Sequence, residues 1–579
     1  MSVSKKNIIV LQLTALYILS PVLARGQSAY PFSGSYSQTP GPVEKIVLFT
    51  DRSIYCTNER VYFTACYSCP GKPDSLNWSK VLYVELITWN GDKIVQLKLR
   101  LNLQGAYGSF KIPDNVLSGN YYLRAYTRWM RNYSANLYGY NLLKIVNPFN
   151  PDINAGQVET QSEIRFRQDT MQRDRKIDGV SCFSVTKNYK TREKVEIRLV
   201  SDSNLPLSCC HYCVSVVKEG MTNAEFYSFA GSTAKTKKPQ EIEYLPDIRG
   251  ISVTGKIIDK ATRLPLKNVI MFASEPAKGQ YLSTYLTDDA GRFIFTLPYM
   301  KGEYDLYTGA GLPDTVKTEI YIDNDFCDKP ITLPYIPFQL NNNEKKLVKE
   351  MMINVQLNEK FLNDEIRAYD TTNNYCVFYG HSTSVVYPDK YIELPTLEEF
   401  FAELVPDVYL RHKKGTAYLQ NEGMTGLSDS RPLVLLDNIP VNDMESLLKI
   451  PSGMIDRIEV INRGYIVADM KYNGLISIYS KNNDYAGLDV NRNSIFFTYK
   501  LYADDSRDVP FVKPDSIYPG KPIRRNLLYW NPDIVVSASK ETVISFTTPD
   551  NPGDYIVIVQ GYTSRSESIL YGTCSFSVR

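Results

Sequence analysis

Residues 50–63 read TDRSIYCTNERVYF, and the fold class of the chain follows from this stretch and its surroundings. Residues 45–49 (KIVLF) before it and 81–86 (VLYVEL) after it are short runs of aliphatic and aromatic residues, which favour strands. The sequence Asn90-Gly91-Asp92 then supplies a hairpin turn. Short strands separated by turns at this spacing predict a β-sandwich over residues 27–150.

The pattern of this stretch occurs a second time. The spacing Tyr-x-x-x-Glu-x-Val is found at Tyr55, Glu59 and Val61 and again at Tyr189, Glu193 and Val195. Internal similarity of this kind indicates a repeated module. Because the strand spacing around both copies is also shared, we expect a second β-sandwich of similar build over residues 151–248.

Residues 118–127 (SGNYYLRAYT) and 129–132 (WMRN) extend the pattern of residues 50–63. Together these stretches resemble the macroglobulin-type sandwich of the alpha-2-macroglobulin superfamily, in the version common in exported proteins of the Bacteroidetes. Thioester-bearing members need a Cys-Gly-Glu-Gln run, which this sequence lacks. The resemblance therefore implies a scaffold that presents loops rather than a thioester protease trap. A macroglobulin-like protease-binding protein remains an alternative.

A third module follows. Residues 255–269 (GKIIDKATRLPLKNV) and 287–293 (TDDAGRF) predict strands joined by turns. They resemble the carboxypeptidase regulatory-like domain, which implies a small β-sandwich over residues 249–336. The catalytic domain of that family needs a His-x-x-Glu pair to hold zinc. None of the three histidines of this chain has a Glu three positions later, which excludes carboxypeptidase activity.

The strongest helical signal lies in the next segment. Apolar residues recur every three to four positions from 343 to 361, which predicts a helix within a linker of residues 337–394. Thr396 and Glu399 then form a capping box that predicts the start of another helix. We expect the first helix to pack on a neighbouring domain.

Residues 431–441 (RPLVLLDNIPV), 454–461 (MIDRIEVI) and 472–481 (YNGLISIYSK) predict a hairpin and two alternating strands. Their order and spacing resemble the plug domain of TonB-dependent outer-membrane receptors, which implies an α+β module over residues 395–485. The remaining residues 486–579 are too few for a receptor barrel, and their strands and turns predict a C-terminal β-sandwich. The resemblance implies a plug without its own barrel, with a separate outer-membrane barrel as a candidate partner.

Composition and charge narrow the function classes. The 579 residues include 65 Lys and Arg against 63 Asp and Glu, a net charge of +2. This balance offers no electrostatic attraction for nucleic acid or an anionic membrane surface. With 43 Tyr and only 3 His, the chain favours strands and has little of the commonest acid/base residue.

The N-terminus predicts export. Lys5 and Lys6 precede an apolar run from 8 to 23, and small residues allow a cut after Gly26. This order is typical of a secretory signal peptide over residues 1–26. The run is short for a membrane span, although an N-terminal anchor remains an alternative. We expect an exported protein of the periplasm or outer membrane with no transmembrane span in the mature chain.

Cysteine usage is compatible with export. The ten Cys include two Cys-x-x-Cys pairs, Cys66 with Cys69 and Cys210 with Cys213. Both pairs lie in strand-like runs, where an odd separation sends the side chains to opposite faces. The pairs are also too far apart for a zinc ribbon. We therefore expect buried thiols, or one or two local disulfides, and no metal site.

Three groups of residues are candidate sites. The run from Gly380 to Ser384, with Ser382 as nucleophile, imitates the elbow of a serine hydrolase but lacks the final Gly. Asp288-Asp289 and residues 323–325 (Asp-Asn-Asp) could hold calcium, although such clusters are ordinary turn residues.

Exposed aromatic side chains could also form a platform for a glycan or a peptide, and the candidates are Tyr133, Tyr138 and Tyr140. Cross-strand packing is the alternative for these three residues.

The sequence therefore predicts a mainly β protein of tandem Ig-like or macroglobulin-like sandwiches with one α+β plug-like domain. We expect a non-enzymatic, exported binding or scaffold protein, an accessory to an outer-membrane receptor or uptake assembly. Its partners would be a cell-envelope protein and a glycan or peptide. No catalytic, cofactor-binding or metal-binding residue is assigned, and no cofactor is expected. A serine hydrolase that uses the Ser382 loop is the alternative from another class.

Overall fold

A computed structural model describes residues 43–579 with gaps. The gaps are residues 70–77, 157–168, 171–179, 202–210, 223–224, 227–241, 277–278, 363–376, 423–430, 504–521, 537–540 and 564–567, and positions 104, 314, 330, 332, 414, 469 and 491. The expected signal peptide, residues 1–26, lies outside the described residues. Among the described residues, no helix combines the length and apolar character needed to cross a membrane.

The first sandwich contains two mostly antiparallel sheets, with strand orders β1-β3-β6 and β2-β8-β7-β4-β5. Its eight strands are β1 (Lys45–Thr50), β2 (Ile54–Cys56), β3 (Arg60–Ser68), β4 (Val81–Ile87), β5 (Lys93–Arg100), β6 (Gly105–Lys111), β7 (Gly119–Tyr126) and β8 (Gly139–Val146). Two short 3₁₀ helices, η1 (Trp129–Asn132) and η2 (Ala135–Leu137), connect β7 to β8. Inward-facing residues of both sheets form the core between them.

The second sandwich is built from two segments that lie far apart in the sequence. Its sheets have the orders β10-β12-β32 and β11-β34-β33-β13-β31. The first segment supplies β10 (Val180–Ser184), β11 (Asn188–Tyr189), β12 (Lys194–Ser201) and β13 (His211–Lys218). The second supplies β31 (Leu527–Val535), β32 (Thr542–Thr547), β33 (Gly553–Thr563) and β34 (Ser568–Val578).

This pairing corrects the expectation of two separate sandwiches over residues 151–248 and 486–579. Strand β12 pairs with β32, with Val195 opposite Phe546, and β13 pairs with both β31 and β33. Each segment alone exposes the inner faces and edges of its strands, so the two halves bury them against each other. The two segments therefore form one discontinuous domain.

The two sandwiches share one topology, strand for strand. In chain order, β1 to β8 of the first occupy the places of β10, β11, β12, β13, β31, β32, β33 and β34 of the second. Both also contain a short parallel pair, β2 with β8 and β11 with β34. In the first sandwich β4 and β5 are joined by a tight turn, whereas residues 219–526 separate the equivalent strands β13 and β31. The rest of the molecule is thus an insertion in a hairpin.

The third sandwich is part of that insertion. Its sheets have the orders β18-β15-β20 and β17-β16-β19-β30. The strands are β15 (Ser252–Asp259), β16 (Ile270–Ser274), β17 (Leu282–Leu286), β18 (Arg292–Thr296), β19 (Glu303–Ala310), β20 (Thr318–Ile322) and β30 (Ser494–Lys500). Because β30 pairs with β19 from far along the chain, the residues between β20 and β30 form a second, nested insertion.

The nested insertion contains the α+β module, called here the distal module (residues 377–490). Its main sheet has the order β21-β26-β29-β24-β25, flanked by the hairpins β22-β23 and β27-β28. Its strands are β21 (Ser384–Val386), β22 (Val408–Lys413), β23 (Thr416–Asn421), β24 (Leu433–Leu436), β25 (Ile439–Pro440), β26 (Ile455–Ile461), β27 (Tyr465–Val467), β28 (Met470–Tyr472) and β29 (Leu475–Ser480). Its helices are η4 (Pro388–Lys390), α3 (Leu397–Glu403), α4 (Met444–Leu448), η5 (Ser452–Met454) and η6 (Tyr485–Gly487).

Several local predictions for this module are confirmed. Thr396 caps α3 by accepting a hydrogen bond from the Glu399 amide. The predicted hairpin turns at Asp437 and Asn438, both with positive φ. The module begins earlier than expected, however, because β21 belongs to its main sheet although it lies within the predicted linker of residues 337–394.

Helix α2 (Asn342–Leu362) connects the sandwiches rather than merely linking modules. Its residues Leu347, Val348 and Met351 pack in one cluster with Ile54 of the first sandwich and Val217 of the second.

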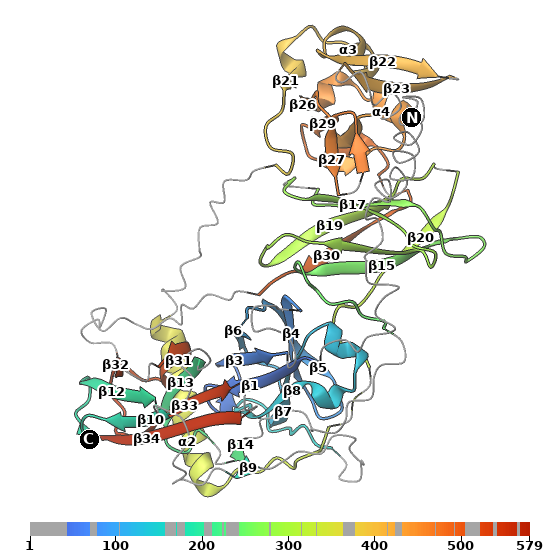
Figure 1. Ribbon diagram of the computed structural model, residues 1–579. Helices are drawn as coiled ribbons and strands as arrows, with labels where there is room; N and C mark the ends of the chain where they lie inside the picture. Colours follow the sequence, from blue (N-terminus) through green and yellow to red (C-terminus); the bar gives the residue numbers. More distant parts are fainter. Residues whose placement is uncertain are drawn as a thin grey trace, which may run out of the picture.

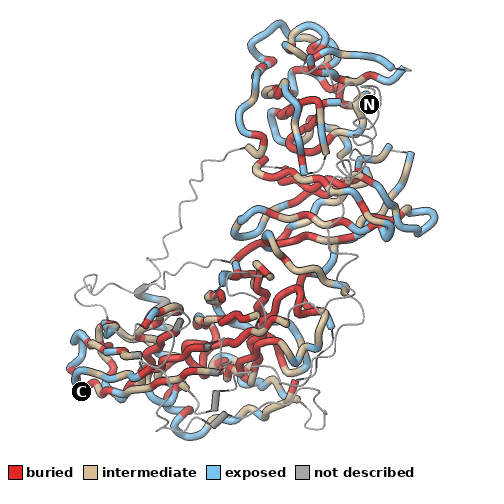
Figure 2. The backbone as a smooth tube through the Cα atoms, in the orientation of Figure 1, coloured by how far each residue is buried: buried red, intermediate tan, exposed pale blue. Residues whose placement is uncertain are grey.

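Figure 1 shows the two sandwiches side by side below, with the third sandwich and the distal module stacked above them. Buried backbone is continuous through the two lower sandwiches (Figure 2), because they share a further apolar cluster. A small pair, β9 (Asp169–Thr170) and β14 (Glu225–Phe226), completes the described strands.

Candidate functional site

The motif at residues 50–63 forms a buried cluster of charges. The Arg52 guanidinium donates to Asp51 at 2.7 Å and to Glu59 at 2.8 Å. The Tyr55 hydroxyl donates to Asp51 at 2.7 Å, and the Cys56 amide donates to Glu59 at 2.7 Å. All of these side chains are buried, so each charge is matched by a partner inside the protein.

This cluster also touches the chain next to the ends of β13 and β31, where the insertion leaves and re-enters the second sandwich. The side-chain amide of Asn526 donates to Glu59 at 2.6 Å, and the backbone amides of Ser53 and Ile54 both donate to the carbonyl of Met221 at 3.2 Å. Burial raises the pKa of Asp51 to about 6 despite the neighbouring Arg52. The motif is therefore a structural joint between two sandwiches.

The second copy of the motif repeats the backbone contacts without the burial. The Lys190 amide donates to Glu193 at 2.6 Å, as the Cys56 amide does to Glu59 in the first copy. Asn58 and Arg192 occupy the same left-handed turn position, with φ of 69° and 58°. The repeat inferred from spacing is thus a repeat of structure.

Three arginines of the 124–132 stretch join the first sandwich to the inserted third sandwich. Arg124 pairs with Glu85 at 2.6 Å and donates to the carbonyl of Cys327 at 3.0 Å. Arg128 donates to the carbonyl of Ser252 at 2.9 Å. These residues are buried, and so is Arg131, which donates to the carbonyl of Asp325 at 2.8 Å.

A buried lysine completes this joint. Lys98 of β5 pairs with Asp325 at 2.5 Å and donates to the carbonyl of Lys500 at 2.7 Å, so it contacts the segment that follows β20 and the end of β30. Burial lowers the pKa of Lys98. Sequence reasoning missed Lys98 and the three arginines as joint residues; the available signal was Arg124, Arg128 and Arg131 interleaved with aromatic residues over 121–131.

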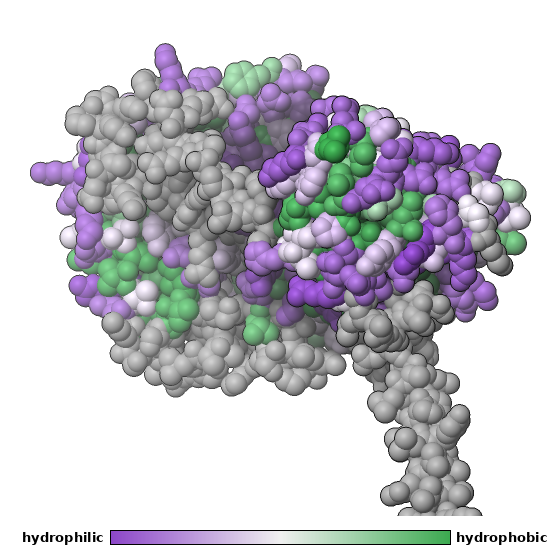
Figure 3. Space-filling model, turned by 90° about the horizontal axis from the view of Figure 1, so that it is seen from above, coloured by the Kyte–Doolittle hydropathy of each residue, from purple (hydrophilic) through white to green (hydrophobic). Residues whose placement is uncertain are grey.

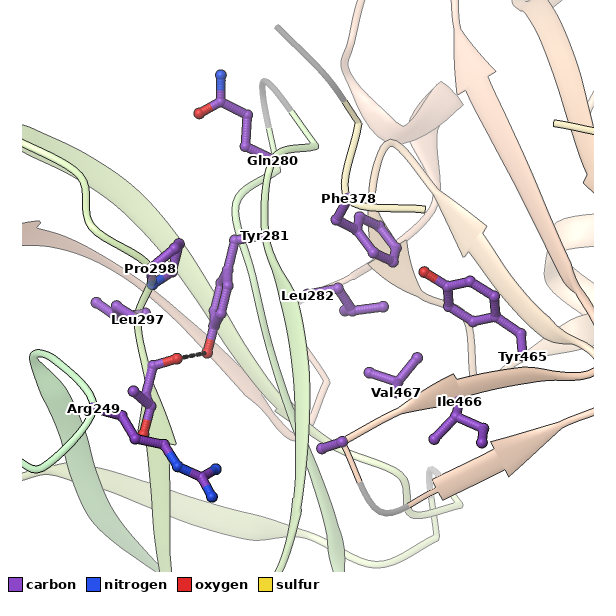
Figure 4. A pocket seen from close by; sticks show the side chains of 12 residues that line it. Arg249, Gln280, Tyr281, Leu282, Leu297, Pro298, Phe378, Tyr465, Ile466 and Val467 are labelled. Carbon is purple, nitrogen blue, oxygen red and sulfur yellow. Dashed lines mark hydrogen bonds between the residues drawn. The ribbon is translucent and has the colours of Figure 1, made fainter. Parts of the chain in front are cut away.

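A cleft lies between the third sandwich and the distal module, with a volume of about 430 Å³. Figure 4 shows Tyr281, Leu297 and Arg249 on one wall and Phe378 and Tyr465 on the other. The Tyr281 hydroxyl donates to the carbonyl of Thr296 at 3.2 Å, which fixes that ring. The cleft thus offers aromatic faces beside one guanidinium, a surface suited to a peptide or a sugar.

The distal module carries an exposed apolar surface. Its members are exposed by 37% to 83% and are Val385, Tyr387, Tyr391, Ile392 and Met454. They lie together because β21 and η4 pack on β26, and η5 lies against η4. We call this set the distal apolar surface. Figure 3 looks down on the distal module and shows hydrophobic side chains gathered among hydrophilic ones.

Charges of both signs border the distal apolar surface. Lys481 pairs with Asp389 at 2.7 Å, and the Lys390 ammonium lies 4.4 Å from the ring centre of Tyr387. An apolar centre within a polar rim is the usual anatomy of a protein interface. The mixed signs also match the near-neutral charge of the whole chain.

The structure does not place Ser382 in a nucleophile elbow. An elbow needs a turn between a strand and a helix, whereas Ser382 follows a turn at Gly380 and leads into strand β21. The neighbouring Thr383 amide donates to the carbonyl of Val460, which ties the loop to the sheet. The hydrolase alternative therefore loses its geometric basis.

The candidate calcium residues are occupied by other partners. Asp288 accepts hydrogen bonds from the Ala290 and Arg292 amides within its own turn, and Asp325 pairs with Lys98. Within the described ranges, no group of three or more His, Cys, Asp or Glu residues could hold a metal ion. These aspartates are turn and joint residues.

For two of the three candidate platform residues the packing alternative holds. Tyr138 and Tyr140 are each only 1% exposed, and Tyr138 stacks on Tyr126 with ring centres 4.6 Å apart. The sheet face that carries them is covered by the chain around Cys327, whose sulfur lies 3.6 Å from the Tyr138 hydroxyl. Tyr133 is half-buried and packs on Trp129.

Of the predicted Cys-x-x-Cys residues, Cys66 and Cys213 are buried and Cys69 is half-buried. Cys210 lies outside the described residues. Cys66 and Cys213 belong to one apolar cluster between the first and second sandwiches. They act as packing residues there.

Comparison with solved structures finds bacterial alpha-2-macroglobulins. The Salmonella protein reacted with methylamine is 9% identical, with 96% of this chain and 40% of that chain covered and a TM-score of 0.23. The native Escherichia coli protein is 9% identical, with 93% and 40% covered and a TM-score of 0.22. The chain thus spans about 40% of the length of these proteins.

A putative membrane anchored protein from Corynebacterium diphtheriae is 13% identical, with 50% of this chain and 57% of that chain covered and a TM-score of 0.13. No protein-family model matches the sequence, and no curated protein matches it. The resemblances of residues 249–336 and 395–485 to named domain families stay predictions.

Proposed function

We propose that the chain is a non-enzymatic scaffold of the bacterial cell envelope that presents its distal module to a protein partner. The distal apolar surface is the observation that carries this proposal. Large exposed apolar side chains on neighbouring segments, with Ile392 83% exposed, are costly in water unless a partner covers them. The signal-like residues 1–26 support export.

The nested insertions support a presenting role. The outer insertion leaves and re-enters the second sandwich through the neighbouring strands β13 and β31, and the nested insertion lies between β20 and β30 of the third sandwich, so each insertion is connected to its host at both ends. The lower joint is held by the buried pair of Lys98 and Asp325. The upper joint shares a core, in which Leu282 of the third sandwich packs with Leu435 of the distal module. Such joints resist bending, as a scaffold requires.

The partner is proposed to be a protein rather than a lipid surface or nucleic acid. A net charge of +2 gives no general attraction to phosphates. The rim of Asp389, Lys390 and Lys481 offers both signs of charge for paired contacts. A separate outer-membrane barrel, or another component of an uptake assembly, would satisfy these requirements.

Site-specific photo-cross-linking tests the proposal. A benzophenone side chain at Tyr391 in cells that produce the protein should yield a discrete cross-linked species, and Ile392→Asp should reduce its yield at least fivefold. The matched control is Ile353→Asp, because Ile353 on α2 is also exposed, by 49%. Cross-linking that responds equally to both substitutions, or that yields no discrete species, would contradict the proposal.

The cleft supports a second candidate function, the binding of a glycan or peptide. Phe378 and Tyr465 pack edge to face with ring centres 6.4 Å apart and line one wall of the cleft, opposite the wall that carries Arg249 (Figure 4). Tyr465→Ala should abolish binding in a glycan and peptide array, whereas Tyr409→Ala on the β22 hairpin should not. Equal binding by both variants would contradict this second function.

A further inference from the structure

Cys182 and Cys574 form a thiol pair that closes the discontinuous sandwich. Cys182 lies in β10, near the start of the first segment, and Cys574 lies in β34, near the end of the second. Their Sγ atoms lie 2.7 Å apart. From the sequence we expected buried thiols, or one or two local disulfides, whereas this pair joins residues on either side of the insertion.

The surrounding backbone supports the close approach. A Cβ atom on Gly572, two positions before Cys574, would lie 3.2 Å from the carbonyl oxygen of Val180, two positions before Cys182. The two strands belong to opposite sheets, so the thiols meet between the sheets at the sandwich edge. Disulfides require about 2.05 Å between sulfurs, so a small side-chain rotation is enough to bring these thiols to bonding distance.

The pair is also accessible. Of the seven cysteines that the structure describes, four are buried, whereas Cys182 and Cys574 are half-buried. A small oxidant or a protein disulfide can therefore reach them, while the buried thiols stay protected. Exported proteins meet such oxidants routinely.

We infer that Cys182 and Cys574 are a redox modification site that forms a disulfide clasp across the discontinuous sandwich. One thiolate attacks a sulfur of a disulfide donor, such as glutathione disulfide, and releases one glutathione thiolate. The second thiolate attacks the protein sulfur of the mixed disulfide and releases the other. The protein loses two electrons and two protons, and the donor disulfide is reduced to two thiols.

The clasp has a structural consequence. Without it, the two halves of the second sandwich are joined covalently only through residues 219–526. With it, cleavage anywhere in the inserted modules leaves the halves linked. The inference is independent of the proposed function, because it concerns the host sandwich and not the distal module.

The test uses the full chain, with a site for a sequence-specific protease placed after Gly415 in the β22-β23 hairpin, where no atom lies within 4 Å of a Cβ at Gly415. After oxidation with glutathione disulfide and cleavage, the fragments should migrate together in a non-reducing denaturing gel and separate after reduction. Cys182→Ser should abolish the linkage, and Cys69→Ser, which changes another half-buried thiol, should keep it.

Mass spectrometry of the unmodified chain keeps the test decisive if Cys182→Ser does not fold. A linked peptide pair containing Cys182 and Cys574 supports the clasp. Alkylation of both thiols after oxidation would overturn it. We also expect reduction of the disulfide to lower the melting temperature of the second sandwich by roughly 5–15 °C. If mass spectrometry confirms the disulfide and reduction leaves the melting temperature unchanged, the stabilising role of the disulfide is overturned.

Discussion

The first and second sandwiches have the same eight-strand topology, yet one is continuous and the other is split by residues 219–526. The difference lies at a single connection. In the first sandwich a turn at Gly91 joins β4 to β5, and in the second the same pair of neighbouring strand ends holds the whole insertion. Loop closure costs grow slowly with loop length, so a hairpin whose ends stay adjacent can accept entire domains.

The shared motif shows a second difference, in burial. In the first sandwich Asp51 and Arg52 are buried, whereas the equivalent residues of the second, Val185 and Thr186, are exposed. The same backbone turn is therefore a joint in one sandwich and a surface loop in the other. Burial, not the motif, sets how much each residue contributes to stability.

The largest expected difference between the two sandwiches is in the stability lost on substitution at the equivalent positions 52 and 186. Arg52→Met leaves Asp51 and Glu59 buried without their cation, so we expect the first sandwich to lose about 3–5 kcal/mol. Thr186→Ala should change the stability of the second by about 0.5 kcal/mol or less. Urea unfolding followed by hydrogen exchange of each sandwich measures both. Similar losses at both positions would remove the distinction between joint and surface loop.

Substitution of the equivalent glutamates, Glu59 and Glu193, should also cost more stability in the first sandwich than in the second, by a smaller margin than at positions 52 and 186. Glu59 accepts hydrogen bonds from Arg52, the Cys56 amide and Asn526. Glu59→Gln turns one acceptor into a donor, and we expect a loss of about 2–3 kcal/mol. Glu193→Gln, at the exposed equivalent, should cost about 0.5 kcal/mol or less. The same unfolding measurement applies, and a larger loss at Glu193 would reverse the comparison.

The smallest expected difference between the two sandwiches is in how their stability depends on pH. Burial raises the pKa of Asp51 from its ordinary 3.8 to about 6, so the folded state binds this proton more tightly than the unfolded state. The contribution of Asp51 to stability should therefore fall as the pH rises from about 4 to about 6. Asp51→Asn should flatten this slope in melting temperatures of the first sandwich.

The second sandwich should respond with the opposite sign. A hydrogen bond from Arg192 lowers the pKa of Asp550 below its ordinary 3.8, so this contribution is present above pH 4 and is lost as the pH falls further. Because Asp550 is partly exposed, the effect should be small. A slope of the same sign in both sandwiches would contradict the assignment of these groups.

Local structure could be predicted from the sequence, and long-range pairing could not. The alternation of residues 45–63, the repeat at Tyr189 and Glu193, and the cap at Thr396 each depend on neighbours along the chain, and each is found in the structure. The partner of β12 depends on residues from 542 onward. Strand patterns show which face is buried but not which strand buries it.

Prediction of the candidate functional surfaces from the sequence had the same limit. Tyr138 and Tyr140 have the composition of an exposed platform, but the chain around Cys327 covers them. The distal apolar surface was not foreseen, because Ile392 lies in a segment that the sequence assigned to a linker. The first outcome depends on a contact between modules and the second on where the distal module begins, and neither leaves a periodic signal in the sequence.

The central claim is that residues 180–218 and 527–578 form one sandwich, and cross-linking across β12 and β32 tests it most directly. Glu196 lies opposite Ser545 in the second sandwich, and Ser109 occupies the place of Ser545 in the first, opposite Tyr62. With Glu196→Cys and Ser545→Cys, a short thiol cross-linker should give a linked peptide in high yield. Glu196→Cys with Ser109→Cys should give none. Absence of the first linkage, or equal yields from both pairs, would contradict the discontinuous sandwich.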